Sequence, residues 1–207
     1  MNSHSNDNTS KYSFKELVIA SSNPHKLSEL RMLLPDEITL HDQSKFNLQT
    51  PEETGLTFLE NALLKARFAS RATGLAALAD DSGLAVACLN GAPGIYSSRY
   101  AGEKASDLEN CNKLLDRMSL EAYRQAHFHC SIVLVRHWQD PDPIIAQGRW
   151  HGEIITQMQG SNGFGYDPVF LPAHLSQTAA QLDSLTKADL SHRGRALSKL
   201  KAQLVNE

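Results

Sequence analysis

Residues 75–87 read Leu-Ala-Ala-Leu-Ala-Asp-Asp-Ser-Gly-Leu-Ala-Val-Ala, so two adjacent carboxylates stand between two short apolar runs. Apolar runs of this length are typical of buried strands. Gly83 permits a sharp change of direction after the carboxylates. The pattern therefore predicts an acidic turn, Asp80 to Gly83, between two strands. Two interpretations are open: a metal or general-base site, or an ordinary turn closed by an aspartate side chain.

Helices and strands alternate on the N-terminal side of this stretch. Leu17 to Ala20 form a short apolar run that predicts a buried strand. The polar segment Ser21 to Lys26 follows and leads into leucines at helical spacing. Thr57 and Glu60 form a capping box ahead of an apolar helix face, so the next helix is expected to begin there. Gly74 is expected to end it.

The C-terminal side contains more strand patterns than helix patterns. A turn is predicted at Asn90-Gly91, and Ser106 with Glu109 predicts a third capped helix. We expect the inner face of that helix to carry Leu108, Cys111, Leu115 and Met118. Alternation at residues 128–134 predicts a strand, and residues 144–150 and 169–171 are further strand candidates. A last helix is expected to begin near Gly194.

This order of elements indicates an α/β or α+β architecture around a mixed sheet with flanking helices. The glycine-rich segment at residues 160–165 does not separate two halves of different composition, so no linker is expected there. We predict one domain over residues 15–207, with a central cleft between two lobes. Residues 1–14 are almost entirely polar, and we expect them to form a disordered tail.

Composition excludes several classes of function. The 207-residue chain has a formal net charge of -3 and a pI near 6.3, so it lacks the basic field that polymeric nucleic acid or an anionic membrane requires. Three widely spaced cysteines fit a reducing cytoplasm better than a disulfide framework. Neither a secretory signal nor an apolar run of membrane-spanning length is present. We therefore expect a cytoplasmic protein whose partner is a small molecule.

The segment Ser21 to Lys26 has the outline of an anion site. Hydroxyl groups, an ammonium and free backbone N–H groups lie at a predicted helix N-terminus, where a phosphate is favoured. The glycine patterns of a Walker A loop and of a dinucleotide fingerprint are both missing. An ordinary capped turn is the alternative interpretation.

Two further segments suggest contacts to a flat, polar ligand. In residues 162–168, glycines flank Phe164, so the backbone can approach a ligand on which the ring stacks. Lys187 and residues 191–194 place basic and hydroxyl donors ahead of the last helix. A hairpin turn and a solvated helix cap are the respective alternatives.

The remaining candidates are less specific. Glu52 and Glu53 precede the second helix and are either metal ligands or an acidic approach to its N-terminus. His127 and His129 have the spacing of a strand, and no second pair of ligands stands at zinc-site spacing. We expect structural roles for both histidines.

Taken in order, these segments resemble the inosine triphosphate pyrophosphatase family, whose members act on noncanonical purine nucleoside triphosphates (XTP/dITP diphosphatases). The likeness covers nearly all of the chain after the tail and rests on six stretches in register. They are residues 20–30 (ASSNPHKLSEL), 53–62 (ETGLTFLENA), 79–84 (ADDSGL), 91–99 (GAPGIYSSR), 163–168 (GFGYDP) and 191–194 (SHRG). Small departures occur at Ser21-Ser22, where Thr-Gly is frequent, and at His25, where a smaller residue is common.

The resemblance implies an elongated α/β fold with two lobes, a homodimer and a Mg²⁺ cofactor. It also implies that Asp81 is the proton acceptor and a metal ligand, and that Glu52 or Glu53 joins the metal site. Triphosphate binding would fall to Ser21, Ser22, Asn23, Pro24, His25 and Lys26, with a substrate contact from Ser82. The purine pocket would comprise Phe164, Gly165, Tyr166, Asp167, Lys187, His192 and Arg193.

The implied reaction converts ITP, dITP or XTP to the monophosphate and pyrophosphate. Donors that face a 6-keto group would meet the 6-amino group of adenine donor to donor, which is a strong basis for rejection. A related pyrophosphatase for another damaged nucleotide is one rival. A nucleotide-binding regulatory module without turnover is a second, although extra negative charge does not help a pure binder of phosphate. The sequence lacks a P-loop and the signatures of a kinase, so we discount a phosphate-transferring kinase.

Overall fold

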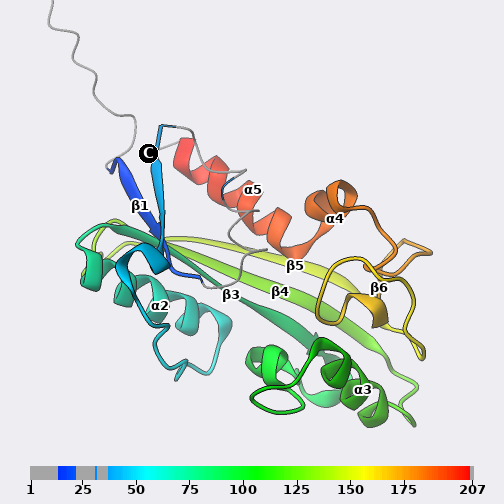
Figure 1. The fold of residues 1–207 in the computed structure, drawn as a ribbon. Coiled ribbons are helices and arrows are strands. Elements are labelled where there is room, and N and C mark those ends of the chain that lie inside the picture. The colour runs from blue at the N-terminus through cyan, green and yellow to red at the C-terminus, as the bar shows by residue number, and fades with distance from the viewer. Residues whose placement is uncertain (1–13, 22–30, 32–36, 206–207) are drawn as a thin grey trace, which may run out of the picture.

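The computed structural model describes residues 14–21, 31 and 37–205. Within them, one mixed sheet has the strand order β2-β1-β3-β4-β5-β6 (Figure 1). β1 is parallel to β2 and to β3, and every later pair is antiparallel. The strands are β1 (Glu16–Ile19), β2 (Thr39–Asp42), β3 (Ala76–Val86), β4 (Gln125–Val135), β5 (Ile144–Ile154) and β6 (Phe170–Pro172).

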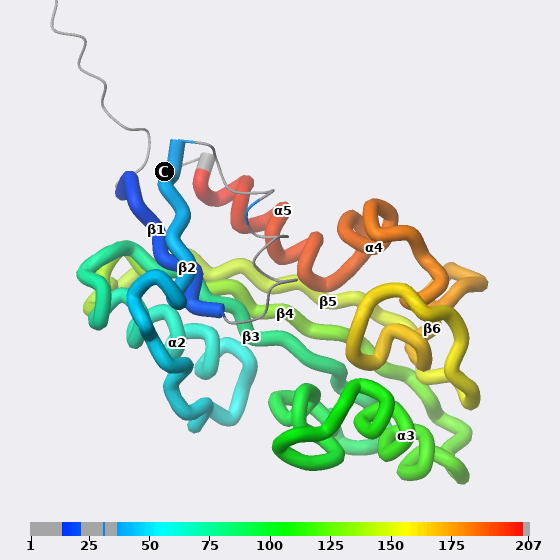
Figure 2. Tube along the Cα trace, in the orientation of Figure 1, coloured from blue at the N-terminus to red at the C-terminus, as the bar shows by residue number. Residues whose placement is uncertain are grey.

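Helices cover both faces of this sheet, which confirms the predicted α/β class and the single domain. Figure 2 shows β1, β2 and α2 at one end of the long strands, and α3 and β6 at the other. The described helices are α2 (Phe58–Thr73), α3 (Asp107–Arg117), α4 (Ser184–Leu190) and α5 (His192–Val205), with short 3-10 turns η1 (Gln43–Phe46), η2 (Ala87–Leu89), η3 (Gly94–Arg99) and η4 (Asp167–Val169). Among the described residues, none of the helices combines the length and apolarity needed to span a bilayer.

The alternation of side chains along the strands divides the core into layers. On one face, Leu78 and Ile132 pack with Leu197 and Leu200 of α5. On the other face, valines and alanines of the central strands pack against Ala62, Ala66 and Ala69 of α2. Because these alanines are small, α2 lies close to the strand backbones. A third cluster, which includes Leu114 and Phe170, joins α3 to the far end of the sheet.

The predicted acidic turn at Asp80 to Gly83 is wrong. β3 is one continuous strand over these residues and pairs with β4 throughout, with Asp80 opposite Ile132 and Gly83 opposite His129. In the sequence, Gly83 indicates a break in the strand. In the structure, it allows another backbone segment to approach the strand closely. Since successive side chains of a strand point to opposite faces, Asp80 and Asp81 leave β3 in opposite directions.

Gly83 is the point at which η3 docks on β3. A Cβ atom at Gly83 would lie 2.4 Å from Ser97 Oγ and 2.5 Å from the Gly94 carbonyl oxygen. Ser97 Oγ accepts the Leu84 N–H (2.9 Å) and donates to the Gly94 carbonyl (2.6 Å). η3 is therefore held on the strand by a contact that has no room for a side chain.

The predicted starts and ends of the capped helices are confirmed, but the predicted inner face of α3 is partly wrong. Both capping boxes are present, at Thr57 with Glu60 and at Ser106 with Glu109, and Gly74 ends α2 in the left-handed conformation. Leu108 is 59% exposed, which contradicts its predicted place on the inner face of α3.

The inner face of α3 is rotated from the predicted one. It comprises Asn110, Cys111, Leu114 and Met118. Asn110 is polar yet buried there, because its side chain bonds to Ser98 and Ala101. The last helix begins at His192, two residues before the predicted Gly194, with Ser191 Oγ accepting the Gly194 N–H (3.1 Å). α4 was not predicted from the sequence.

The Gly83→Ala variant is expected to lose about 1–3 kcal/mol of unfolding free energy, because the added methyl group forces η3 away from β3. Urea denaturation at pH 7 measures this loss. An unchanged midpoint would show that η3 does not dock on this strand.

Candidate functional site

A cavity of about 910 Å³ opens where β1 ends beside β3. The β1–β3 pairing stops at Ile19 opposite Leu78, so Asp80 and Asp81 lie beyond the last β1 pair. The chain leaves β1 for β2 on one side and returns to β3 on the other side of β1. Such a switch point, at the carboxyl ends of parallel strands, is where open α/β sheets bind ligands.

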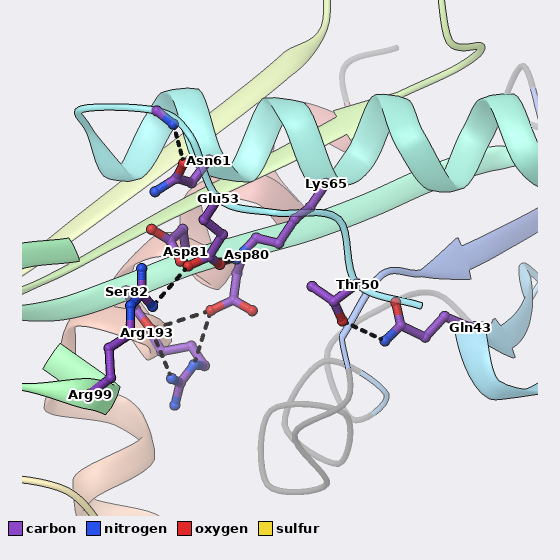
Figure 3. A network of polar contacts seen from close by, with 11 residues as sticks. Gln43, Thr50, Glu53, Asn61, Lys65, Asp80, Asp81, Ser82, Arg99 and Arg193 are labelled. Carbon is purple, nitrogen blue, oxygen red and sulfur yellow. Dashed lines mark hydrogen bonds and ion pairs between the residues drawn. The ribbon is translucent and has the colours of Figure 1, made fainter. Parts of the chain in front are cut away.

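Lys65 joins two carboxylates on the α2 face of the sheet (Figure 3). Its ammonium Nζ lies 2.8 Å from Glu53 Oε1 and 2.9 Å from Asp81 Oδ1. Arg99 Nη1 approaches the other oxygen of Glu53 at 3.5 Å. A buried lysine thus holds together two carboxylates that would otherwise repel each other.

The electrostatics favour the charged forms on both sides of this contact. Burial raises the pKa of Glu53, but Lys65 and Arg99 outweigh burial, and the pKa lies below its usual value. Burial lowers the pKa of Lys65, yet Asp81, Asp80 and Glu53 together hold it above the ordinary lysine value. Glu53 and Lys65 therefore both favour their charged forms.

Asp80 belongs to a second cluster on the α5 face of the same strand. Arg193, in the first turn of α5, places Nε 4.0 Å from Asp80 Oδ2 and Nη2 3.4 Å from Ser82 Oγ. Ser82 Oγ in turn donates to Asp80 Oδ2 (3.4 Å). Both clusters line the same cavity, because β1 no longer separates the two faces at this point.

The same cavity contains an aromatic ring, Phe164, that lies near two cations. Lys187 Nζ lies 4.9 Å from the Phe164 ring centroid and Arg193 Cζ lies 5.7 Å from it. Asp167 accepts the Phe164 N–H (2.8 Å) and pairs with Lys187, while burial raises the pKa of its carboxyl group. His192 stacks on Phe128, with ring centroids 4.8 Å apart.

The loop that carries Glu53 is fixed by α2. Asn61, which is fully buried, accepts the Gly55 N–H through Oδ1 at 2.8 Å. A Cβ atom at Gly55 would lie 2.6 Å from the Glu60 Cβ atom, so only glycine allows the loop to lie against the first turn of the helix. The position of Glu53 thus follows from the capped start of α2.

A family model of the Ham1 family matches residues 17–203. This chain belongs to the Ham1 family. It is 53% identical to a dITP/XTP pyrophosphatase of Vibrio vulnificus (strain YJ016) over 193 residues, which cover 92% of this chain and 96% of the relative. A dITP/XTP pyrophosphatase of Coxiella burnetii (strain RSA 493 / Nine Mile phase I) is 50% identical, over 91% of this chain and 96% of the relative.

Solved Ham1 structures have the same fold. The structure of a HAM1 protein from Coxiella burnetii superposes with a TM-score of 0.90 at 49% identity, over 93% of this chain and 99% of that one. The Staphylococcus aureus Ham1 protein gives a TM-score of 0.87 at 42% identity, with the same two coverages. The predicted family resemblance is therefore confirmed.

The cavity of this Ham1-family chain gathers most of the residues expected from the sequence. Glu52 is the exception among the described candidates, since it is exposed and lies outside the cavity lining. The expected contacts Ser22, Asn23, Pro24, His25 and Lys26 lie outside the described residues. The predicted residues that line the cavity are Ser21, Glu53, Asp81, Ser82, Phe164, Gly165, Tyr166, Asp167, Lys187, His192 and Arg193.

Sequence reasoning missed Lys65, Arg99 and Asp107 at this site. Lys65 had a detectable signal, because it falls on the apolar face of α2 between Ala62 and Ala66. A lysine in such a face is seldom buried without a charged partner. Arg99 and Asp107 carried no comparable signal, since polar residues near helix ends are common.

The two histidines of β4 have the contacts of structural side chains. His129 Nε2 contacts Ser131 Oγ (2.8 Å), Arg149 Nε donates to its Nδ1 (3.4 Å), and its ring stacks on Phe58. Burial, with Arg149 and His127, lowers the pKa of His129 to about 4. His127 lies beside His151, with ring centroids 5.4 Å apart.

This lowered pKa predicts an acid sensitivity. In the unfolded chain His129 binds a proton below its ordinary pKa of 6.5, whereas the folded chain binds it only below about 4. The contribution of His129 to the free energy of unfolding is therefore full above pH 6.5 and falls as the pH drops from 6.5 to 4. The contribution of His129 to this loss is on the order of 2 kcal/mol.

Urea unfolding at pH 6.5 and pH 4 measures the effect in wild type and in His129→Gln, which keeps an amide donor for Ser131. We expect the acid loss to be smaller in the variant by that amount. His137→Gln, at an exposed histidine, is the matched control. Equal acid losses in His129→Gln and wild type would contradict a neutral His129 in the folded protein.

Proposed function

We propose that this chain hydrolyses the noncanonical purine nucleoside triphosphates ITP, dITP and XTP to the monophosphate and pyrophosphate, which removes them from the nucleotide pool. One observation carries the proposal: a carboxylate and cation cluster on β3 and the Phe164 ring line the same cavity. The first suits a metal triphosphate and the second a flat base. The relatives, which match over more than nine tenths of both chains, are named dITP/XTP pyrophosphatases, and these names support dITP and XTP as substrates.

The donor set of the cavity fits Mg²⁺. Glu53 and Asp81 present carboxylate oxygens on one side of the strand, where Lys65 already holds them together. Mg²⁺ prefers oxygen ligands and is commonly held by one or two carboxylates with the substrate phosphates. When bound, the ion supplies charge stabilisation to the departing pyrophosphate. We propose Glu53 and Asp81 as its protein ligands, while the exposed Glu52 is the weaker candidate.

The residues of the chain have distinct parts in the proposed reaction. Asp81 takes the proton of the attacking water as a general base. Lys65 orients the carboxylate of Asp81, because its ammonium lies 2.9 Å from Oδ1. Ser21 and Ser82 offer hydroxyl groups to the phosphates from the cavity wall. By family resemblance, Ser22 to Lys26 complete the triphosphate contacts.

The base is proposed to lie against Phe164. Lys187 and Arg193 lie near that ring, and we propose them as the cationic donors that meet the 6-keto acceptor of the purine. The 6-amino group of adenine would leave such donors unpaired. Asp167 fixes the position of the ring by accepting the Phe164 N–H. It also fixes the ammonium of Lys187 through an ion pair. Gly165, Tyr166 and His192 form the surrounding wall.

We further propose that two copies of the chain form a homodimer through the outer face of β5. Its side chains Ile145, Gln147, Arg149, His151 and Glu153 are exposed. Arg149 and Glu153 carry opposite charges, so a copy related by a twofold axis near His151 would pair each with the other. Light scattering of the purified chain tests the proposal.

Cys88, Cys111 and Cys130 are free thiols, which supports the cytoplasm as the location of the protein. Phe14 packs against the core, which contradicts its place in the predicted tail, and residues 1–13 lie outside the described residues.

Product analysis with a panel of triphosphates tests the proposed function. With Mg²⁺ present, we expect pyrophosphate and monophosphate from dITP, ITP and XTP, and much slower turnover of ATP. Orthophosphate as the product would overturn the proposed reaction. A preference for modified pyrimidines would favour the related pyrophosphatase, and tight binding without turnover would favour the regulatory module.

The Asp81→Asn variant is expected to lower kcat for dITP by about 10²–10⁴-fold, because Asn cannot accept the proton. Pyrophosphate release measures the loss, and circular dichroism shows whether the variant is folded. Asp116→Asn, at an exposed position of α3, is the matched control for the loss of one charge. Activity close to wild type in Asp81→Asn would remove Asp81 from the mechanism.

A further inference from the structure

Side chains on one face of α3 form hydrogen bonds with the loop that carries Phe164. Asp107 and Cys111 are four residues apart, so they lie one above the other on the helix. Asp107 Oδ2 accepts the Gly165 N–H at 2.6 Å, and Cys111 Sγ donates to the Gly165 carbonyl oxygen at 3.3 Å. Both polar groups of one loop residue are thus bound by side chains of a single helix.

The same face of α3 holds a second wall of the cavity. Asn110 Oδ1 accepts the Ala101 N–H (2.7 Å), and its Nδ2 donates to the Ser98 carbonyl oxygen (3.1 Å). The two walls are also joined directly, because the Tyr166 hydroxyl donates to the Ser97 carbonyl oxygen at 2.8 Å. α3 therefore fixes the loop of Phe164 relative to η3, which is docked on β3 at Gly83.

The loop needs such external support. Gly163 and Gly165, on either side of Phe164, have φ angles of 77° and 61°, and glycine has the largest conformational freedom to lose on ordering. The Phe164 N–H is held from the other side by Asp167. The contacts from α3 therefore add to those of Asp167 and Tyr166 in fixing the peptide that follows the ring.

The chemistry of the two side chains suits this task. Burial, with Asp107 and Asp167, raises the pKa of the Cys111 thiol to about 12, so the thiol keeps its proton and acts as a donor. Asp107 lines the cavity at the start of α3, where the helix dipole stabilises a carboxylate. Its hydrogen bond to Gly165 is therefore between a charged acceptor and a backbone donor, which is the stronger kind.

We propose that Asp107 is a positioning residue for base recognition: it holds the Gly165 peptide, and thereby the Phe164 ring, in the place where a 6-keto purine stacks. The inference rests on the proposed function of the cavity. Loss of this contact lets the ring move relative to Lys187 and Arg193. The base then binds more weakly and discrimination between 6-keto and 6-amino purines falls, while the phosphate side of the cavity keeps its contacts.

Four variants of α3 separate this role from helix stability. Asp107→Ala removes the acceptor, and Asp107→Asn retains a side-chain oxygen that can accept the Gly165 N–H. Glu109→Ala is the matched control, because Glu109 has the same charge in the same turn and closes the capping box on Ser106 without touching the loop. Cys111→Ala tests the carbonyl side of the same peptide.

The measurements are KM and kcat for dITP and dATP, together with inhibition by inorganic tripolyphosphate, which occupies only the phosphate side. For Asp107→Ala we expect KM for dITP to rise roughly fivefold and the dITP/dATP ratio of kcat/KM to fall by a similar factor. The inhibition constant of tripolyphosphate should stay unchanged. Asp107→Asn should restore most of the loss, and Cys111→Ala should show a smaller one.

Two results would overturn the inference. One is an Asp107→Ala enzyme with wild-type KM and selectivity. The other is an equal loss of selectivity in Glu109→Ala, which would trace the effect to helix stability. A wild-type chain that turns over neither dITP nor dATP would instead reject the proposed function, so the two failures are distinguishable.

Discussion

The candidate site depends on the length of β3 relative to β1. The β1–β3 pairing ends at Ile19 opposite Leu78, whereas β3 continues to Val86 along β4. Beyond that point β3 has no partner residue in β1. Asp80 and Asp81, which point to opposite faces, therefore line one cavity and bring together helices that pack on different layers.

Glu53, Asp80 and Asp81 each lie near a cation in this cavity. Glu53 and Asp81 share Lys65, Arg99 adds to Glu53, and Asp80 lies near Arg193. A buried ion cluster of this kind contributes little net stability, since desolvation offsets the attraction. It orders the side chains instead, so that a metal triphosphate meets carboxylates and cations that are already in position.

Local signals in the sequence predicted the local structure. Both capping boxes and Gly74 were identified correctly because each depends on residues within one helical turn. The acidic turn was wrong because glycine breaks a strand pattern in sequence, and the atoms that require a glycine at position 83 belong to η3. Leu108 was misplaced because the hydrogen bonds of Asn110 to residues 98 and 101 set the rotation of α3.

The site itself was predicted through family resemblance more than through physical pattern. Lys65 binds residues 12 and 16 positions away, and no spacing rule relates them. Asp107 reaches a residue 58 positions away. Contacts at such separations follow from the way the sheet and helices pack, which the periodicity of a single sequence does not specify.

The opposite orientation of Asp80 and Asp81 limits how this gene can change. A deletion or insertion of one residue in β3 would turn every later side chain to the other face, so Asp81 would meet Arg193 and lose Lys65. Such a frame-preserving codon loss would be as damaging as the loss of a carboxylate.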